Sequence, residues 1–154
     1  MFEFFRFIIV SIIGLFLFGC VYLYLNQNKM LYMTVSKYSI NLVENVSTRD
    51  IRSNPLGNRH PAEADMIYEE VFVKTNDNLK LFGWFIKQAI PFDCPTLIYF
   101  QENAGNIGMR IPFMKKLYNK LRVNILIVGY RGYGYSEGIP SEEGLMLDGE
   151  VTYS

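Results

Sequence analysis

The sequence predicts an α/β fold: a β-hairpin, then a parallel strand–helix–strand unit, all behind one transmembrane helix. Three observations predict it. An uncharged apolar run extends from Phe7 to Leu25. Two segments rich in β-forming residues are joined by a polar turn, and two short apolar runs flank an amphipathic segment. The first feature is typical of a membrane span and the other two of a mixed sheet with a crossover helix.

The composition is that of a folded protein and excludes several classes of function. Of the 154 residues, 50% are hydrophobic, and the 15 Lys and Arg balance the 15 Asp and Glu. Such a chain is too apolar to be disordered, and zero net charge argues against a nucleic-acid-binding domain, which is usually basic. Cys20 and Cys94 are too few for a disulfide scaffold or a cysteine zinc site. We expect no metal, no cofactor and no nucleic-acid partner.

The run from Phe7 to Leu25 is long enough to cross the hydrocarbon core of a bilayer, about 30 Å thick, as a helix. Tyr22 and Tyr24 lie near its end, where aromatic side chains favour the membrane interface. A buried core helix and a cleaved signal peptide are the alternatives. The run exceeds the about 7–15 apolar residues of a signal peptide, and no small-x-small cleavage site follows. We expect an uncleaved single-pass anchor in a membrane; its orientation stays open, because Arg6 and Lys29 flank it on opposite sides.

The rest of the chain divides into a tail, an arm and a domain. Residues 1–6 form an N-terminal tail, and residues 26–66 form a polar connecting arm containing N-P, G-N and H-P breaker pairs. His60, the only histidine, lies in this arm, so we expect it at the surface and not in a catalytic site. Residues 45–47 form a glycosylation sequon, which matters only if the domain is lumenal. The folded domain covers residues 67–154.

The domain begins with a predicted hairpin. Ile67 to Thr75 and Leu79 to Lys87 are rich in β-formers and alternate partly, and the N-D-N tripeptide between them is a turn signal. Thr96 to Phe100 is a short apolar run that suits a strand buried on both faces.

A crossover unit follows. After a polar turn over 101–108, apolar residues recur at helical spacing: Met114, Leu117, Tyr118 and Leu121. Val123 to Gly129 is a second apolar strand, and a strand–helix–strand order implies a right-handed parallel crossover. We expect Val123 to Gly129 to form an unpaired apolar edge of the sheet. A glycine-rich loop from Tyr130 to Gly138 comes next, and Ser141 begins a last helix.

The turn at 101–106 is the first candidate for chemistry. It directly follows a buried-type strand and precedes a helix, so its backbone N–H groups point beyond the end of the strand. Such donors suit an oxyanion, because they stabilise the negative charge that develops in a transition state. An ordinary strand–helix turn made of small residues remains the alternative on spacing alone.

Ser136 lies in a literal G-x-S-x-G match, the pattern of a nucleophile elbow. That pattern is catalytic only where strand, serine and helix are nearly contiguous. Here the loop is offset from the strand that ends at Gly129, and no histidine follows. We therefore interpret Ser136 as a loop residue and not as the nucleophile.

Taken together, these residues resemble a known family. The chain is similar to the N-terminal half of the membrane-anchored α/β-hydrolase-domain proteins of the bud-emergence type. The similarity is carried by the strand followed by N-A-G-N-I-G, by the amphipathic helix, and by the sequences VNILIVGYRGYGYSEG and SEEGLMLDGE. The resemblance extends from Asn28 to Ser154 and implies half of an α/β-hydrolase fold on one N-terminal anchor. It also implies a serine hydrolase acting on acyl esters or thioesters; relatives of similar architecture remove palmitate from proteins.

The resemblance also assigns roles to residues. It implies that Glu102 and Asn103 form the oxyanion-hole loop. It implies that seven further residues shape the site: Gln101, Ala104, Gly105, Asn106, Arg131, Gly132 and Gly134. In the family the catalytic serine, acid and histidine come later than Ser154, so we expect no catalytic residue within this chain. The chain is then expected to be an inactive fragment, or an incomplete gene model, of a longer enzyme.

The chain departs from the family pattern at four positions. Gln101 replaces histidine, Glu102 replaces glycine, Gly129 replaces aspartate and Tyr135 replaces lysine. A carboxylate at Glu102 would oppose an oxyanion nearby. These departures leave a second hypothesis open, a non-catalytic membrane-tethered pseudo-hydrolase or interaction module.

Overall fold

The computed structural model describes residues 2–32 and 50–153, which form two units divided between Leu31 and Tyr32. The sequon at 45–47 lies outside the described residues. The first unit is a single helix, α1 (Phe2–Leu31), of 30 residues. At about 1.5 Å per residue it is roughly 45 Å long, so it continues beyond both ends of the apolar run from Phe7 to Leu25.

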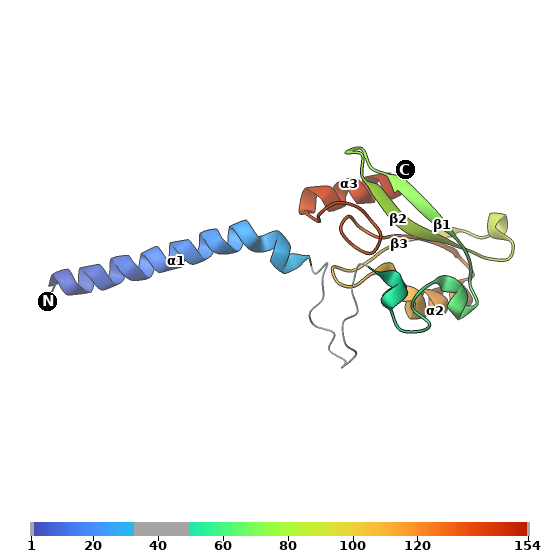
Figure 1. Cartoon of the computed structure of the whole chain (residues 1–154), viewed down its shortest axis with the longest axis horizontal. Coiled ribbons are helices and arrows are strands. Elements are labelled where there is room, and N and C mark those ends of the chain that lie inside the picture. The colour runs from blue at the N-terminus through green and yellow to red at the C-terminus, as the bar shows by residue number, and fades with distance from the viewer. Residues whose placement is uncertain (1, 33–49, 154) are drawn as a thin grey trace. The chain divides into compact units, whose positions relative to one another are not determined.

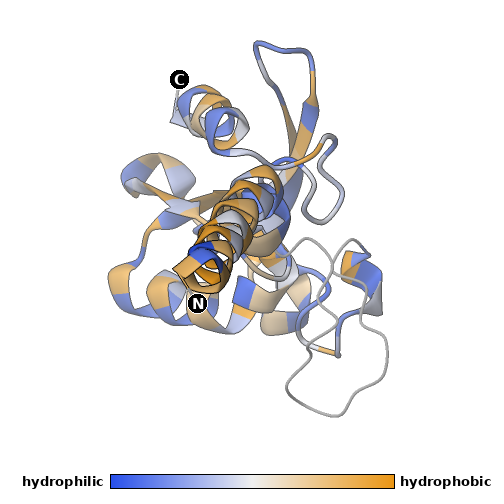
Figure 2. Cartoon of the chain, turned by 90° about the vertical axis from the view of Figure 1, so that its left-hand side faces the viewer, coloured by the Kyte–Doolittle hydropathy of each residue, from blue (hydrophilic) through white to orange (hydrophobic). Residues whose placement is uncertain are grey.

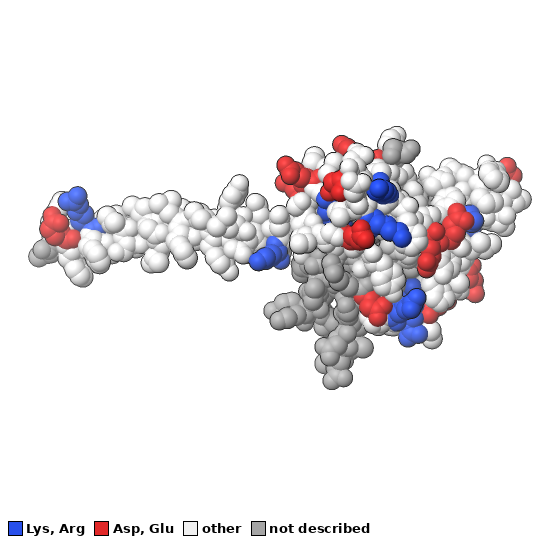
Figure 3. Space-filling model, turned by 45° about the horizontal axis from the view of Figure 1, so that its top comes forward, with Lys and Arg blue, Asp and Glu red and all other residues white. Residues whose placement is uncertain are grey.

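Helix α1 is apolar around its whole circumference over most of its length (Figure 2). Its charged residues are confined to the two ends, with Glu3 and Arg6 at one and Lys29 at the other (Figure 3). None of its residues is buried within the chain. By length and composition it can cross a membrane. A helix that is apolar on every side has no polar face suited to water, which distinguishes it from a surface helix of a soluble domain.

The described part of the second unit contains a mixed sheet and two α-helices. The described residues form four strands in the order β1-β2-β4-β3 (Figure 1). Their bounds are β1 (Ile67–Lys74), β2 (Lys80–Lys87), β3 (Thr96–Phe100) and β4 (Asn124–Val128). β1 pairs with β2 and β2 with β4 in antiparallel fashion, whereas β3 and β4 are parallel. The predicted hairpin and the predicted parallel crossover are both confirmed.

The expectation for the sheet edge is wrong. β4, predicted as an unpaired edge, lies between β2 and β3 and pairs with both, so the edges of the described sheet are β1 and β3. This central place agrees with the full burial of Ile125 and Ile127 of β4 in the core. β3, expected to be buried on both faces, is only half-buried, and Phe100 at its end is exposed.

Helices α2 (Ile111–Leu121) and α3 (Glu142–Tyr153) lie on opposite faces of the sheet (Figure 1). On the α2 side, Met114 packs into a cluster that includes Trp84, Ile86 and the two isoleucines of β4. Burying each such side chain contributes about 1.5–3 kcal/mol, which makes this cluster the main core. The spacing therefore predicted α2 correctly, except that Leu121 in its last turn is exposed.

Residues 51–66, which the sequence analysis assigns to the connecting arm, pack against the α2 side of the sheet. They contain two 3₁₀ helices, Ile51–Ser53 and Pro61–Ala64, and both Ile51 and Met66 belong to the core cluster. His60, between the two, is exposed, as expected.

Candidate functional site

The turn at 101–106 lies at the carboxyl end of β3, where it leads into a 3₁₀ helix, Ile107–Arg110, and then α2. Asn106 caps the 3₁₀ helix: its side-chain Oδ1 accepts a hydrogen bond from the N–H of Gly108 at 3.0 Å. Gly105 adopts a left-handed φ of 78°, which reverses the chain just before the cap. The strand–turn–helix arrangement predicted from the sequence is therefore present.

The Glu102 carboxylate does not lie unpaired beside the turn. Its Oε2 is 3.1 Å from Nη1 of Arg110, and Nη2 of the same guanidinium donates to the carbonyl of Ala104 at 2.6 Å. Arg110 thus pairs with the Glu102 carboxylate and also binds the backbone of the turn at Ala104. The backbone N–H of Glu102 donates to no acceptor in the described part of the chain. A free N–H at a strand end is the kind of donor that an oxyanion site uses.

The carbonyl of Asn103 is fixed from the glycine-rich loop. The Tyr133 hydroxyl donates a hydrogen bond to it at 2.8 Å, and the Tyr133 side chain is buried. Burial raises the pKa of Tyr133 to about 12, so the hydroxyl retains the proton that it donates across the physiological range. Tyr133 therefore connects the two loops to which the family resemblance assigns the site.

Gln101, at the start of the turn, is buried, yet neither its side-chain oxygen nor its nitrogen has a hydrogen-bond partner among the described residues. A buried amide left in this state costs about 1–3 kcal/mol. Ala104, two residues before the Asn106 cap, is half-buried.

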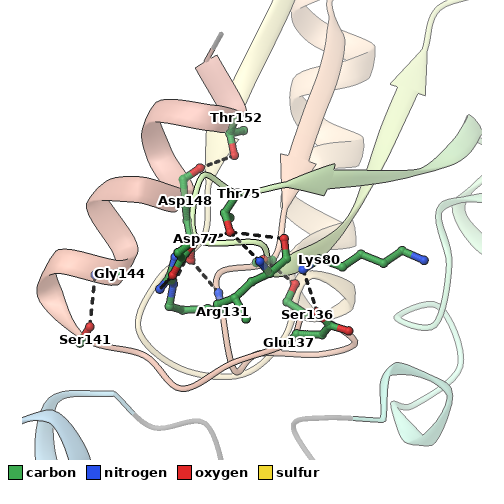
Figure 4. Close-up of polar contacts among 12 residues, drawn as sticks. Thr75, Asp77, Lys80, Arg131, Ser136, Glu137, Ser141, Gly144, Asp148 and Thr152 are labelled. Atoms are coloured by element: carbon green, nitrogen blue, oxygen red, sulfur yellow. Dashed lines mark hydrogen bonds and ion pairs between the residues drawn. The ribbon is translucent and has the colours of Figure 1, made fainter.

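Arg131 lies in a buried ion network with Asp148 and Asp77 (Figure 4). Its Nε and Nη2 donate to Oδ1 of Asp148 in α3, at 2.9 and 2.8 Å, and its backbone N–H donates to Oδ2. Its Nη1 also donates to Asp77 in the β1–β2 turn, at 2.8 Å. Burial lowers the pKa of the Arg131 guanidinium, but the hydrogen bonds to Asp148 and Asp77 outweigh it, so the pKa lies above its usual value. Arg131 thus ties the hairpin, the loop and α3 together.

Glycines allow the close packing of the glycine-rich loop and of Arg131 against α3. A Cβ at Gly144 in α3 would lie 2.6 Å from the Arg131 side chain, so no larger residue fits without displacing the guanidinium. Gly134 has a left-handed φ of 55°, a conformation that other residues rarely adopt, and Ile51 packs directly against it. Gly132, with a φ of 80°, is also left-handed. The loop residues assigned by resemblance therefore shape the backbone of the loop.

Ser136 is buried, and its hydroxyl both donates and accepts a hydrogen bond. It donates to the carbonyl of Gly129 at 2.6 Å and accepts from the N–H of Phe82 at 3.0 Å. These bonds join the loop to the end of β4 and to β2. The interpretation of Ser136 as a loop residue is confirmed, because its oxygen faces the sheet.

We expect the change Ser136→Ala to lower the free energy of unfolding by about 1–3 kcal/mol, because it leaves the buried N–H of Phe82 without an acceptor. A fluorophosphonate probe should not label Ser136, and mass spectrometry of the labelled protein can check this. An adduct mapped to Ser136 would overturn the assignment.

The structure brings together the turn and Tyr133, but it does not bring Arg131 to the turn. Three residues near the turn carry no signal in the sequence analysis: Tyr133, Arg110 and Asn54. Asn54 stood there only within a breaker pair and within the stretch that resembles the family, although its side chain bonds to Asn106. Among the described residues, no group of three or more His, Cys, Asp or Glu side chains could hold a metal ion.

Comparisons with known proteins extend this picture. No family model matches the chain. The α/β-hydrolase-domain-containing protein WAV2 of Arabidopsis thaliana is 41% identical over 91 residues, which are 59% of this chain and 30% of that protein. Protein bem46 of Schizosaccharomyces pombe is 41% identical over 102 residues, 63% of this chain and 34% of that protein. An uncharacterised membrane protein of Saccharomyces cerevisiae is 35% identical over 132 residues, 86% of this chain and 40% of that protein.

Among solved structures, an esterase of Pyrococcus furiosus, Pf2001, is similar with a TM-score of 0.50 at 24% identity, over 65% of this chain and 37% of that one. That likeness shows the fold alone. The chain spans about a third of the length of WAV2 and bem46. The strand order, the crossover and the sequence matches agree: this chain is similar in sequence to WAV2 and bem46, and its described residues form part of an α/β-hydrolase fold.

Proposed function

We propose that the protein containing this chain is a membrane-anchored serine hydrolase of acyl esters or thioesters, in which the turn at 101–106 stabilises the oxyanion. The observation that carries the proposal is the backbone N–H of Glu102 at the carboxyl end of β3, which has no acceptor among the described residues, in a chain similar to α/β-hydrolase-domain protein WAV2. We place the serine, acid and histidine of the triad in the part of the protein that this chain does not span.

The chemistry of acyl transfer explains why this turn matters. When a serine attacks an ester or thioester carbonyl, negative charge develops on the carbonyl oxygen, and N–H donors already aimed at it lower the barrier. In this proposal the N–H of Glu102 supplies one donor, and Asn103 lines the same loop. Arg110 holds the Glu102 carboxylate by an ion pair, so its charge is offset where the oxyanion forms.

The anchor supports a substrate with a long acyl chain. Helix α1 can cross a membrane, and one homologue is named as a membrane protein. An enzyme tethered to a bilayer meets acyl chains that are themselves inserted in it, and palmitate on a protein thioester is one such chain. We therefore propose protein depalmitoylation as the finer form of the activity.

One observation favours a second candidate, a non-catalytic pseudo-hydrolase. Gln101 replaces the family's histidine and Glu102 its glycine, so the turn departs from the family pattern at the two positions where the proposed oxyanion site begins. This candidate predicts an intact fold without turnover.

The two candidates differ in a direct assay. The full coding sequence is expressed with its anchor in membranes and tested with p-nitrophenyl esters of short and long acyl chains, and with a fluorophosphonate probe. The hydrolase proposal expects turnover and a labelled serine outside this chain. Folded protein without turnover and without labelling would establish the pseudo-hydrolase instead.

We expect the chain to stay with membranes through α1. The run from Phe7 to Leu25 carries no charge and is long enough to span the hydrocarbon core. Carbonate washing of membranes followed by immunoblotting checks this, with a variant carrying two arginines in the middle of the run as control. Full-length wild-type protein in the soluble fraction would contradict the prediction.

A further inference from the structure

We propose that Asn54, from the segment between α1 and the sheet, is a positioning residue that holds the turn at 101–106 in the conformation needed for catalysis. The proposal rests on the function proposed above for this turn. Neither a sequence pattern nor the family resemblance assigns Asn54 a role in the site.

The contact that carries the proposal is a reciprocal pair of amide side chains. Nδ2 of Asn54 donates to Oδ1 of Asn106 at 2.8 Å, and Nδ2 of Asn106 donates to Oδ1 of Asn54 at 3.0 Å. The two residues are 52 positions apart in the sequence and are 1% and 0% exposed. Two hydrogen bonds between the same two planar groups fix their distance and their relative orientation, which a single bond does not.

Each member of the pair is also bound on its own side. Nδ2 of Asn54 donates to the carbonyl of Asn58 at 2.7 Å, and the carbonyl of Asn54 accepts from Nε of Arg59 at 2.9 Å. Oδ1 of Asn106 accepts from the N–H of Gly108. A Cβ at Gly108 would lie 2.5 Å from Nδ2 of Asn54, so the backbone approaches the pair as closely as glycine permits. The amides therefore cannot slide past each other.

The turn is consequently held at two points by residues distant in sequence. Tyr133 fixes the carbonyl of Asn103, and Asn54 fixes Asn106 at the end of the turn. The N–H of Glu102, which no described residue accepts, precedes both points. Stabilisation of an oxyanion depends on donors that are already in place, and a misplacement of about 1 Å can cost about 100-fold in rate. Release of Asn106 should thus affect the transition state more than substrate binding.

The experiment compares Asn54→Ala with Asn124→Ala in the full-length protein. Asn124 is a matched control: it is a buried asparagine whose side chain bonds to Pro91, Cys94 and Gln88, at the opposite end of β4 from the turn. Both changes remove a buried amide with several partners, so both should lower thermal stability. Only Asn54→Ala should affect the turn.

We expect Asn54→Ala to lower kcat for ester hydrolysis by about 10- to 100-fold with little change in KM, and to speed hydrogen–deuterium exchange in the peptide covering 101–108. Asn124→Ala should leave kcat and the exchange at 101–108 near their wild-type values, although its Tm should be similar to that of Asn54→Ala. Should Asn54→Ala fail to fold, Asn54→Ser, which keeps a hydroxyl donor, is measured in its place. Equal effects of the Asn54 and Asn124 changes on kcat and on exchange would overturn the proposal.

The exchange measurement also separates this proposal from the proposed function. If the wild-type protein hydrolyses no ester, the hydrolase proposal fails by itself. Faster exchange at 101–108 in the Asn54 variant alone would then still support the positioning of the turn by Asn54, and unchanged exchange there would refute it.

Discussion

Replacement of Asp148 by alanine is expected to lower the free energy of unfolding by about 3–5 kcal/mol, because it leaves the buried guanidinium of Arg131 without its principal counter-charge. Asp148 is fully buried and accepts three hydrogen bonds from Arg131, two from the side chain and one from the backbone. Asp77 would remain, but its side chain is 40% exposed and cannot compensate inside the protein. Most small domains are stable by only about 5–15 kcal/mol, so this single change would remove a large share of the stability.

The matched control is Glu69→Ala. Glu69 forms an ion pair with Lys87 at 2.7 Å between β1 and β2, but its side chain is half exposed, and such surface pairs contribute about 0–1 kcal/mol. Thermal melts of the detergent-solubilised full chain compare the two variants with wild type. A loss of thermal stability for Asp148→Ala as small as that for Glu69→Ala would show that the Arg131 network does not stabilise the domain.

The elements that the sequence predicted well are those with a local signal. The N-D-N tripeptide placed the turn of the hairpin, where Asn78 does adopt a left-handed φ of 67°. The spacing of Met114, Leu117 and Tyr118 placed α2, because these three side chains face the core. The context of Ser136 excluded it as a nucleophile, since the distance from strand to serine is visible in the sequence.

The order of the strands could not be obtained in the same way. Alternation and apolarity show that a segment forms a strand, but not which strands lie beside it. β3 and β4 have similar apolar sequences, and only packing decides that β4 is central. Ile51 and Met66 belong to the core, but each is an isolated apolar residue outside any helical or strand periodicity. Hydrophobic periodicity therefore could not predict that they are buried in the core.

The contacts around the candidate site also could not be predicted from the sequence. Arg131 meets Asp77 54 positions away, and Asn54 meets Asn106 52 positions away. Tyr133 is one of three tyrosines in the glycine-rich loop, and nothing local distinguishes the one that bonds to Asn103. The family resemblance indicated which loops matter, whereas the structure shows which side chains connect them.

The second large effect is expected at Glu102, where the proposed role belongs to the backbone and not to the side chain. Proline at this position removes the N–H, whereas alanine keeps it. Loss of one oxyanion donor typically lowers kcat by about 10²–10³-fold. Alanine removes only the carboxylate and its ion pair with Arg110, a pair whose Glu102 side chain is 65% exposed, so its effect should be far smaller.

Comparing the two variants removes the ambiguity of either one. Both lose the Glu102 carboxylate, so any effect of its charge on the site is common to them. The residue before a proline is restricted to extended conformations, and Gln101 directly follows the extended strand β3. Thermal melts of both variants show whether the fold survives before activity is compared.

The ratio of kcat between Glu102→Ala and Glu102→Pro, measured on one acyl ester with the full-length membrane-anchored protein, is the most direct test of the turn as an oxyanion site. The proposed role of the Glu102 N–H predicts a ratio of about 10²–10³. Equal kcat values for the two folded variants would show that the Glu102 N–H takes no part in the reaction.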